Sequence, residues 1–421
     1  MPDNNRQEVL VVSYSEMAKA LPGVEEALAV PAEGAPRLKP REKIDFIFRL
    51  HDAMEELRAL PDRPGVLVTP RDQFASLLQS AFAEASARSG RVSRAPGVSA
   101  LEAKFDKTDV GWASVAWAWL KRALRGRIGY ARPQKTGVLP RPFRAAIFGD
   151  WGTGLYGAPV IGRSIAGDPA PVDLVLHLGD TYYSGTGGEF EKRFDPHWPE
   201  RPGALHRSLN ANHEMYSGGR AYRKTVRSKF GQKSSVFSLA NDDWLLIGMD
   251  TALEDHSLND EQAAWVEALV DGAGGRKVVL FSHHQPFSRL DKQGPKLIEK
   301  LRPVLDGRKI FAWYWGHEHH CVLYERHPKW GFWGRCIGHG GIPEFRHELL
   351  GRAPKKPSWK RFPAAGLIPG CRVLNGSNEF LGKLAQQYSP HGYATLIFDG
   401  AKLIEEIRDA HGEVLRTTEL D

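Results

Sequence analysis

Cysteine is scarce in this sequence of 421 residues, which holds only Cys321, Cys336 and Cys371. Three such widely separated cysteines exclude a disulfide framework and a zinc knuckle. No uninterrupted apolar run reaches the ~18 residues that a membrane-spanning helix needs. The first residues also lack the basic and apolar segments of a secretory signal. We therefore expect a cytoplasmic protein that has no signal peptide and no transmembrane segment.

The sequence also lacks a strong excess of charge of one sign. Hydrophobic residues make up 42% of the chain and charged residues 25%, which is ordinary for a globular protein, and the net charge is +7. This mild bias suits an anionic substrate but does not indicate specific nucleic-acid binding. Residues 110–149 contain no acid, and a basic, tryptophan-containing stretch at 112–127 is compatible with peripheral membrane contact. A helix that packs on the next domain, with a solvated basic side, is the favoured interpretation.

The N-terminal 140 residues show mainly helical periodicity. Apolar residues recur at three- and four-residue spacing in 43–60, 71–90 and 112–124, and proline and glycine break the pattern between the first two. Residues 132–142 have the composition of a linker. We expect 1–140 to form a mainly helical region of unknown role.

Residues 141–421 have a different pattern, in which short apolar β-strands alternate with helices. One helix is predicted at 258–270, with Asn259 as its N-cap. This alternation predicts a layered α/β domain. The stretch 343–390 is rich in Pro, Gly, Lys and Arg and shows little periodicity, which predicts a long loop insertion.

Polar residues follow several of the predicted strands. In FGDWGTG (148–154) the apolar strand AAIF runs directly into Asp150, and the glycines match neither the dinucleotide-binding order nor a P-loop. A carboxylate at the end of a buried strand projects into the crevice where α/β proteins place their sites. Four later segments place similar groups at Asp180, Asn212–His213, His283–His284, and His317 with His319. Carboxylate, amide and imidazole are ligands of divalent metals and Fe(III), so we expect a two-metal hydrolytic site.

The order Gly-Asp, Gly-Asp, Asn-His-Glu, His, Gly-His-x-His resembles the calcineurin-like metallophosphoesterase superfamily over about residues 144–400. The resemblance implies a four-layer αββα sandwich of two mixed β-sheets. Many members carry a metal-binding histidine two residues after the first aspartate, where this chain has Gly152. Purple acid phosphatases also lack that histidine and bind Fe(III) through a tyrosine three residues after the second aspartate, which corresponds here to Tyr183. The motifs are most similar to those of the smaller purple acid phosphatases.

This resemblance implies two metal ions, Fe(III) and a divalent Fe, Zn or Mn ion. The implied ligands of the first ion are Asp150, Asp180, Tyr183 and His319, and those of the second are Asp180, Asn212, His284 and His317. His284 is chosen because the family's histidine usually stands two residues before a proline, and His283 is kept as the alternative.

Outer-sphere catalysis is assigned to His213, which would donate to the phosphoryl oxygen or the leaving group. The second such histidine of purple acid phosphatases has no counterpart in QPFSRLDKQGPK (285–296), and His339 is the proposed substitute. Simple loop packing of His339 is an equal alternative.

The function implied is a binuclear-metal-dependent phosphatase that hydrolyses small phosphate monoesters through attack by a metal-bound hydroxide. A phosphodiesterase acting on cyclic nucleotides or other diesters is the main alternative. A degenerate phosphoesterase used as a binding module is the other. Substrate-binding residues and the oligomeric state are not predicted.

Overall fold

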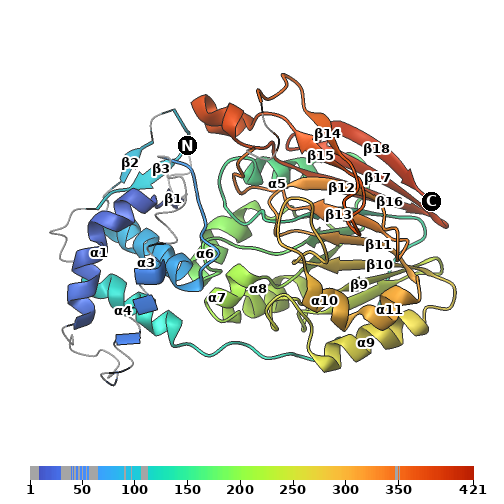
Figure 1. Ribbon diagram of the computed structural model, residues 1–421, viewed down its shortest axis with the longest axis horizontal. Coiled ribbons are helices and arrows are strands. Elements are labelled where there is room, and N and C mark those ends of the chain that lie inside the picture. The colour runs from blue at the N-terminus through green and yellow to red at the C-terminus, as the bar shows by residue number, and fades with distance from the viewer. Residues whose placement is uncertain are drawn as a thin grey trace.

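A computed structural model describes residues 9–29, 39, 41, 44–45, 48–49, 51–53, 55, 65–89, 92–95, 97–105, 112–346, 349 and 351–421. The N-terminal helices lie to one side of a large two-sheet body, which holds the C-terminus (Figure 1). In the described part of the chain, no helix has both the length and the apolar character needed to cross a membrane.

The first sheet of the body has nine strands, and its central members are parallel. β10 pairs in parallel with β9 and β11, and β11 pairs in parallel with β13. The order is β14 (Ser358–Phe362), β15 (Cys371–Asn375), β12 (Cys321–Arg326), β13 (Trp333–Ile337), β11 (Ile310–Trp315), β10 (Lys277–Ser282), β9 (Trp244–Gly248), β8 (Phe237–Ala240) and β4 (Gly137–Val138).

The second sheet has six strands, one half antiparallel and one half parallel. The parallel half runs from β5 to β7, and β16 pairs with β5 in the antiparallel sense. The order is β18 (Val414–Leu420), β17 (Lys402–Asp409), β16 (Gly392–Asp399), β5 (Phe143–Phe148), β6 (Leu174–His177) and β7 (Leu205–Ser208).

Each central strand is buried on both faces. In β5, Ala145 and Ile147 face the other sheet, whereas Ala146 and Phe148 join the outer cluster formed with helices. This follows from the two-residue alternation of side chains along a strand. A strand covered on both sides must be apolar throughout, as AAIF is.

Helices cover the outer faces of both sheets. On the nine-stranded sheet they are α9 (Asp260–Asp271), α10 (Pro295–Lys300) and α11 (Arg302–Asp306). On the six-stranded sheet they are α5 (Ala158–Ala166), α8 (Arg220–Phe230) and the π-helix η1 (Phe190–Phe194). The Asn259 side chain accepts a hydrogen bond from the Gln262 amide, so the predicted N-cap of α9 is confirmed. The four-layer αββα sandwich of two mixed sheets is confirmed as well.

A buried ion pair ties the two sheets together. Arg335 of β13 donates through Nε to both carboxylate oxygens of Glu405 in β17, at 2.8 and 2.9 Å. Tyr314 of β11 donates to the same carboxylate at 2.9 Å. All three side chains are buried, so their hydrogen bonds replace the water that each polar group loses on folding.

The N-terminal part combines helices with a small sheet. The helices whose bounds the structure describes are α1 (Tyr14–Ala29), α3 (Gln73–Ser89) and α4 (Trp112–Ala123), and the small sheet has the order β1 (Leu10–Val11), β3 (Leu101–Ala103), β2 (Val92–Arg94). The predicted helices at 71–90 and 112–124 are therefore present. Most of 43–60 lies outside the described residues.

The N-terminal part packs directly on the sandwich domain. One hydrophobic cluster joins residues of α1, α3 and α4 to Tyr182, Tyr183, Tyr216 and Ile342. The basic stretch after α4 continues into β4, which pairs with β8. The expected linker thus ends as an edge strand of the large sheet.

The stretch 343–390 differs from the predicted loop. It contributes β14 and β15 to the edge of the nine-stranded sheet and a 3₁₀ helix, η4 (Glu379–Gln387). β14 has the sequence SWKRF and is mostly exposed or half-buried. An edge strand with solvated side chains lacks the apolar run that marks a buried strand.

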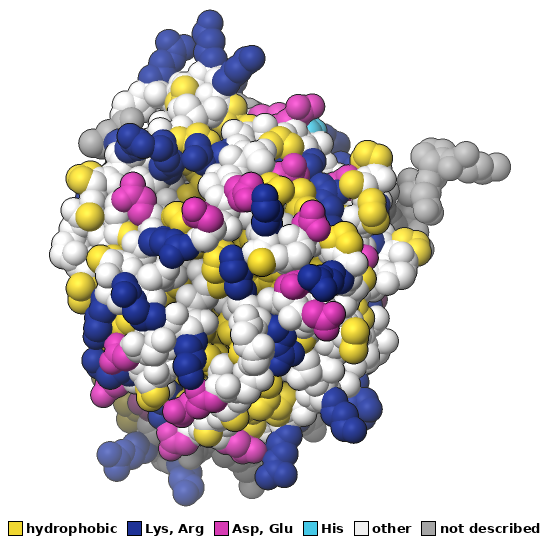
Figure 2. Space-filling model, turned by 90° about the vertical axis from the view of Figure 1, so that its right-hand side faces the viewer, with side chains coloured by type: hydrophobic (Ala, Val, Ile, Leu, Met, Phe, Trp, Pro, Cys, Tyr) yellow, Lys and Arg dark blue, Asp and Glu magenta, His cyan; other side chains and the backbone are white. Residues whose placement is uncertain are grey.

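Surface charge is mixed on the face shown in Figure 2. Lys and Arg side chains alternate there with Asp and Glu, and apolar side chains lie between them. The described side chains on this face do not form the single-sign patch typical of nucleic-acid binding.

Candidate metal centre

Most of the predicted ligands lie where strands of the two sheets end. Asp150 follows β5, Asp180 follows β6, His283 follows β10, and His317 and His319 follow β11. Asn212 and His213 begin the short helix α7 (Asn212–Tyr216), which comes soon after β7. Strands from both sheets therefore deliver these groups to one crevice, as the strand-end pattern predicts.

The backbone at this edge adopts an uncommon conformation. Asp150, Asp180, His317 and His319 have positive φ angles of 56°, 77°, 69° and 56°. Left-handed backbone is rare for residues other than glycine, although Asp and His tolerate it better than most. Such conformations cluster at functional sites, where the surrounding structure holds them.

Two glycines let the surrounding backbone approach the Asp150 carboxylate. A Cβ atom at Gly316 would lie 2.6 Å from Asp150 Oδ2, and one at Gly338 would lie 2.8 Å from the same oxygen. Both distances are shorter than side chains allow. The close packing also lets the His317 amide donate to Asp150 Oδ2 at 2.8 Å.

A first group of candidate ligands consists of Asp150, Asp180, His319 and Tyr182. The Tyr182 hydroxyl lies 3.1 Å from Asp150 Oδ1, 3.1 Å from Asp180 Oδ2 and 3.2 Å from His319 Nε2. His319 Nε2 is 3.5 Å from Asp150 Oδ1. The Nδ1 atom of His319 lies 3.1 Å from Glu344, which orients the ring.

Tyr183, the predicted iron ligand, is not brought into this group. Its hydroxyl accepts a hydrogen bond from the Val12 amide at 2.9 Å, and its ring lies under the Arg193 guanidinium. The hydroxyl thus faces the N-terminal part. The neighbouring Tyr182 takes the place that the sequence assigned to Tyr183, because the turn after Asp180 directs the two side chains to different sides.

A second group consists of Asp180, Asn212, His283 and His317. His283 Nε2 lies 3.0 Å from Asn212 Oδ1, 3.4 Å from Asp180 Oδ1 and 3.2 Å from His317 Nδ1. The other ring nitrogen of His283 lies 2.9 Å from the Leu178 carbonyl, which fixes the ring. Asp180 belongs to both groups and is therefore placed to bridge two ions.

His284, the predicted choice from the histidine pair, lies outside the second group. Its Nδ1 atom is 2.8 Å from the Thr251 hydroxyl. Potential ligand atoms of His284, His256 and His317 lie within 4.8 Å of one another, and this third group does not include Asp180. The sequence spacing to the proline favoured His284, but His283 is the residue that directly follows the strand.

His213 lies at the crevice. Its Nε2 atom is 3.8 Å from Asp180 Oδ2, and its Nδ1 atom makes a short hydrogen bond with the Tyr183 carbonyl. Burial lowers the pKa of His213, although the Asp180 charge opposes this.

His339 is buried away from the cavity that holds the other site residues. Its ring packs against Gly392, and neither ring nitrogen has a hydrogen-bond partner among the described residues. Burial, followed by the nearby His391, lowers the pKa of His339 to about 3. A neutral, enclosed imidazole is not positioned to donate a proton at the candidate centre.

The electrostatics of the crevice suit cations. Burial and the adjacent Asp180 charge raise the pKa of Asp150 well above its usual value. Burial lowers the pKa of His283 to about 4, and burial with the neighbouring His284 lowers that of His317 well below its usual value. Buried carboxylates beside neutral imidazoles form a donor set that fits two metal ions, because metals bind the deprotonated forms.

A cavity of about 250 Å³ opens onto this centre. Asp180, Asn212, His213, His317 and His319 line it. Its other lining residues are Ile342–Phe345 with Tyr388 and, unexpectedly, the N-terminal residues Val68, Thr69 and Arg71. Sequence reasoning missed Arg71 and Glu344, because isolated charged residues in irregular segments carry no local signal.

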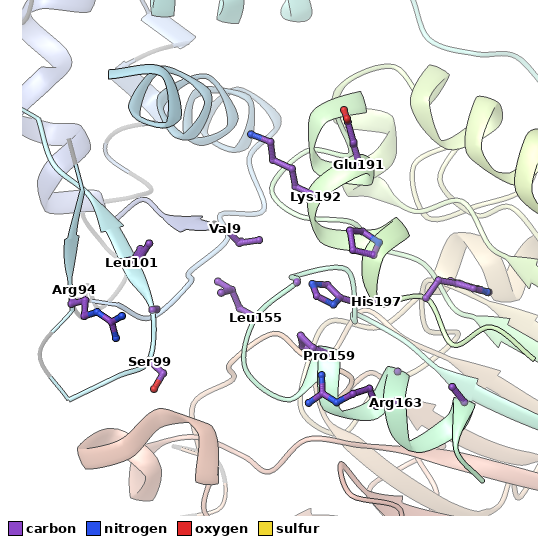
Figure 3. A pocket seen from close by; sticks show the side chains of 16 residues that line it. Val9, Arg94, Ser99, Leu101, Leu155, Pro159, Arg163, Glu191, Lys192 and His197 are labelled. Atoms are coloured by element: carbon purple, nitrogen blue, oxygen red, sulfur yellow. The ribbon is translucent and has the colours of Figure 1, made fainter. Parts of the chain in front are cut away.

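A larger cavity, of about 740 Å³, lies elsewhere, between the N-terminal sheet and α5 (Figure 3). Val9, Leu101, Leu155, Arg163 and Lys192 are among the residues that line it. None of the candidate metal ligands does, so the smaller cavity holds the chemistry.

Comparisons with known proteins agree with this architecture. No curated protein matches the chain significantly. Among solved structures, a purple acid phosphatase from yellow lupin (Lupinus luteus) is 16% identical, with a TM-score of 0.49, over 69% of this chain and 55% of that one. GAP50, described as the anchor in the inner membrane complex of Plasmodium, is 11% identical, with a TM-score of 0.51, over 67% of this chain and 89% of that one. This second likeness concerns the fold alone.

The family comparison covers the strands and loops that build the crevice. The match begins at residue 143, the first residue of β5, and ends at 321, just after the last histidine motif. It includes all the residues of both candidate ligand groups. Residues 143–321 therefore form a domain that matches the calcineurin-like phosphoesterase family.

Proposed function

We propose that the protein is a binuclear-metal-dependent phosphatase that hydrolyses monoesters of small phosphorylated molecules. The observation that carries this proposal is the pair of ligand groups joined by Asp180. A shared carboxylate between two donor sets is the arrangement of two-metal hydrolytic sites. When bound, the two ions would activate water and neutralise charge on the phosphoryl oxygens.

In this proposal Tyr182 replaces Tyr183, and His283 replaces His284. Asp150, Asp180, Tyr182 and His319 would hold the first ion, and Asp180, Asn212, His283 and His317 the second. The distances support these assignments, because the ligand atoms of the first group surround the Tyr182 hydroxyl and those of the second surround His283 Nε2. A phenolate is a hard, anionic donor, so Tyr182 favours Fe(III) in the first position and a divalent ion in the second.

The protein's own groups supply the remaining functions. His213 lies beside Asp180 and lines the cavity. Its Nδ1–H is used by the Tyr183 carbonyl, so Nε2 donates a hydrogen bond to a phosphoryl or leaving-group oxygen only when the ring is protonated. Glu344 holds the His319 ring through Nδ1. Although burial alone would raise it, this contact lowers the pKa of Glu344, which keeps the carboxylate ionised as an acceptor.

The proposal is tested by measuring metal content together with hydrolysis of p-nitrophenyl phosphate and bis(p-nitrophenyl) phosphate. We expect about two ions per chain and a preference for the monoester. Asp180→Asn should lose metal and at least about a hundredfold in activity. Asp399→Asn, at an exposed site in β16, is the matched control and should change neither.

A protein that binds two ions yet hydrolyses neither ester would contradict the proposed function. Faster hydrolysis of the diester would instead favour the phosphodiesterase alternative.

A further inference from the structure

The N-terminal segment 68–73 is held against the candidate metal centre by side-chain hydrogen bonds. Gln73 donates through Nε2 to the Tyr216 carbonyl at 2.9 Å. The Tyr216 hydroxyl donates to the Arg71 carbonyl at 2.6 Å and accepts from Asn212 Nδ2 at 2.9 Å. A candidate metal ligand, Asn212, is thereby connected to the backbone of the N-terminal part through one tyrosine.

The side chain of Arg71 is held in a defined orientation. Both of its terminal nitrogens bind the Asp291 carboxylate, Nη1 to Oδ1 at 3.0 Å and Nη2 to Oδ2. Asp291 belongs to the loop between β10 and α10 of the sandwich domain. A two-point contact of this kind fixes the plane of the guanidinium group, which has five N–H donors, and leaves the other donors free to bind a ligand.

Arg71 lines the cavity of the candidate metal centre. It lines the same 250 Å³ space as Asn212, His213 and His317. Among the described residues that line this cavity, Arg71 is the one permanently charged cation. An anion that enters the cavity therefore meets guanidinium N–H groups that Asp291 does not occupy, although the Asp291 carboxylate offsets part of the Arg71 charge.

We propose that Arg71 binds the phosphoryl group of the substrate, so that the N-terminal part is a specificity-determining wall of the active site. This proposal rests on the proposed phosphatase function. Near neutral pH a monoester carries nearly two negative charges and a diester one, so a fixed guanidinium favours the monoester. The volume is just below the usual 300–1,000 Å³ of ligand pockets, which fits a small phosphorylated metabolite better than a polymer.

The direct test is titration of inorganic phosphate into the purified, metal-containing protein by calorimetry. Arg71→Ala should weaken phosphate binding about ten- to a hundredfold, the value of hydrogen bonds between charged groups. Arg71→Lys keeps the charge without the two-point geometry and should recover part of the affinity. Arg125→Ala, which removes an exposed arginine of the same N-terminal part, is the matched control.

A second readout separates substrate recognition from a structural role. Arg71→Ala should raise KM for p-nitrophenyl phosphate by about the factor by which it weakens phosphate binding. It should raise KM for bis(p-nitrophenyl) phosphate by a smaller factor. Asp291→Asn should change KM less than Arg71→Ala does, because it releases the guanidinium but leaves its charge and donors in place. Unchanged thermal unfolding of each variant shows that the fold is intact.

The outcomes distinguish this inference from the proposed function. Phosphate binding that depends on Arg71, in a protein without esterase activity, would overturn the phosphatase proposal and support the role of Arg71 as an anion-binding residue. An active enzyme in which Arg71→Ala and Arg71→Lys bind phosphate as tightly as wild type would overturn the role of Arg71. Equal KM increases for both esters would overturn its role in selecting monoesters.

Discussion

We expect opposite effects on metal binding when each of the two neighbouring tyrosines, Tyr182 and Tyr183, is changed to phenylalanine. Tyr182→Phe removes the hydroxyl that lies 3.1 Å from both Asp150 and Asp180. We expect the affinity of this variant for the first ion to fall by about tenfold to a hundredfold or more. That range is typical of residues that only hydrogen-bond a metal ligand, and a ligand itself should matter at least as much. If that ion is Fe(III), we expect the oxidised protein to show a broad visible absorption from tyrosinate bound to iron, and Tyr182→Phe should abolish it.

Tyr183→Phe should leave the metal centre intact and weaken the fold. Its hydroxyl is the acceptor for the buried Val12 amide, and an unpaired buried amide costs about 1–3 kcal/mol. The ring contact with Arg193 remains available to phenylalanine. We expect the unfolding temperature of Tyr183→Phe to fall by a few degrees.

Metal analysis, the visible spectrum and thermal unfolding of the two variants together show which tyrosine is the metal ligand. Loss of colour and metal in Tyr183→Phe, with both retained in Tyr182→Phe, would refute this reading of the turn after Asp180.

Three further predictions follow from buried groups. His283→Ala should reduce the metal content by about one ion per chain, whereas His284→Ala should keep both; equal losses would show that the assignment within the pair is wrong. Glu405→Gln should lower the free energy of unfolding by about 3–5 kcal/mol, because it leaves the buried Arg335 charge unpaired, and denaturant titration measures this. Burial lowers the pKa of His327 to about 4, so the unfolded chain binds more protons between about pH 6.5 and 4, and stability falls as the pH drops through that window. His327→Asn keeps an acceptor for the Lys329 and Trp330 amides and should flatten this part of the pH dependence of unfolding, and an unchanged slope would contradict the argument.

The sequence was sufficient for the groups that directly follow regular strands. Asp150 and Asp180 come after short apolar runs, and the carboxyl ends of parallel strands such as β5 and β6 meet at one edge of the sheet. The histidines after β11 were located in the same way. The sandwich itself follows from strands that are apolar on both faces.

Choices between adjacent residues were not accessible from the sequence. Tyr182 and Tyr183, like His283 and His284, differ by one position in irregular backbone, where no period sets the direction of a side chain. There the family spacing pointed to Tyr183 and His284, whereas the contacts place Tyr182 and His283 in the ligand groups. Arg71 contacts Asp291 and Tyr216, which are more than a hundred residues away in the sequence, so no local sequence pattern predicts these contacts.

The hydroxyls of Tyr182 and Tyr183 point to different sides, and they connect metal binding with the docking of the N-terminal part on the sandwich. One side chain reaches the carboxylates of the metal centre, and the next binds the amide of Val12 in the N-terminal part. Linkage is reciprocal, so if docking of the N-terminal part strengthens metal binding, metal binding strengthens docking by the same free energy. Chelation should then loosen the described N-terminal part before it unfolds the sandwich, and protease sensitivity in that part would report whether the centre holds metal.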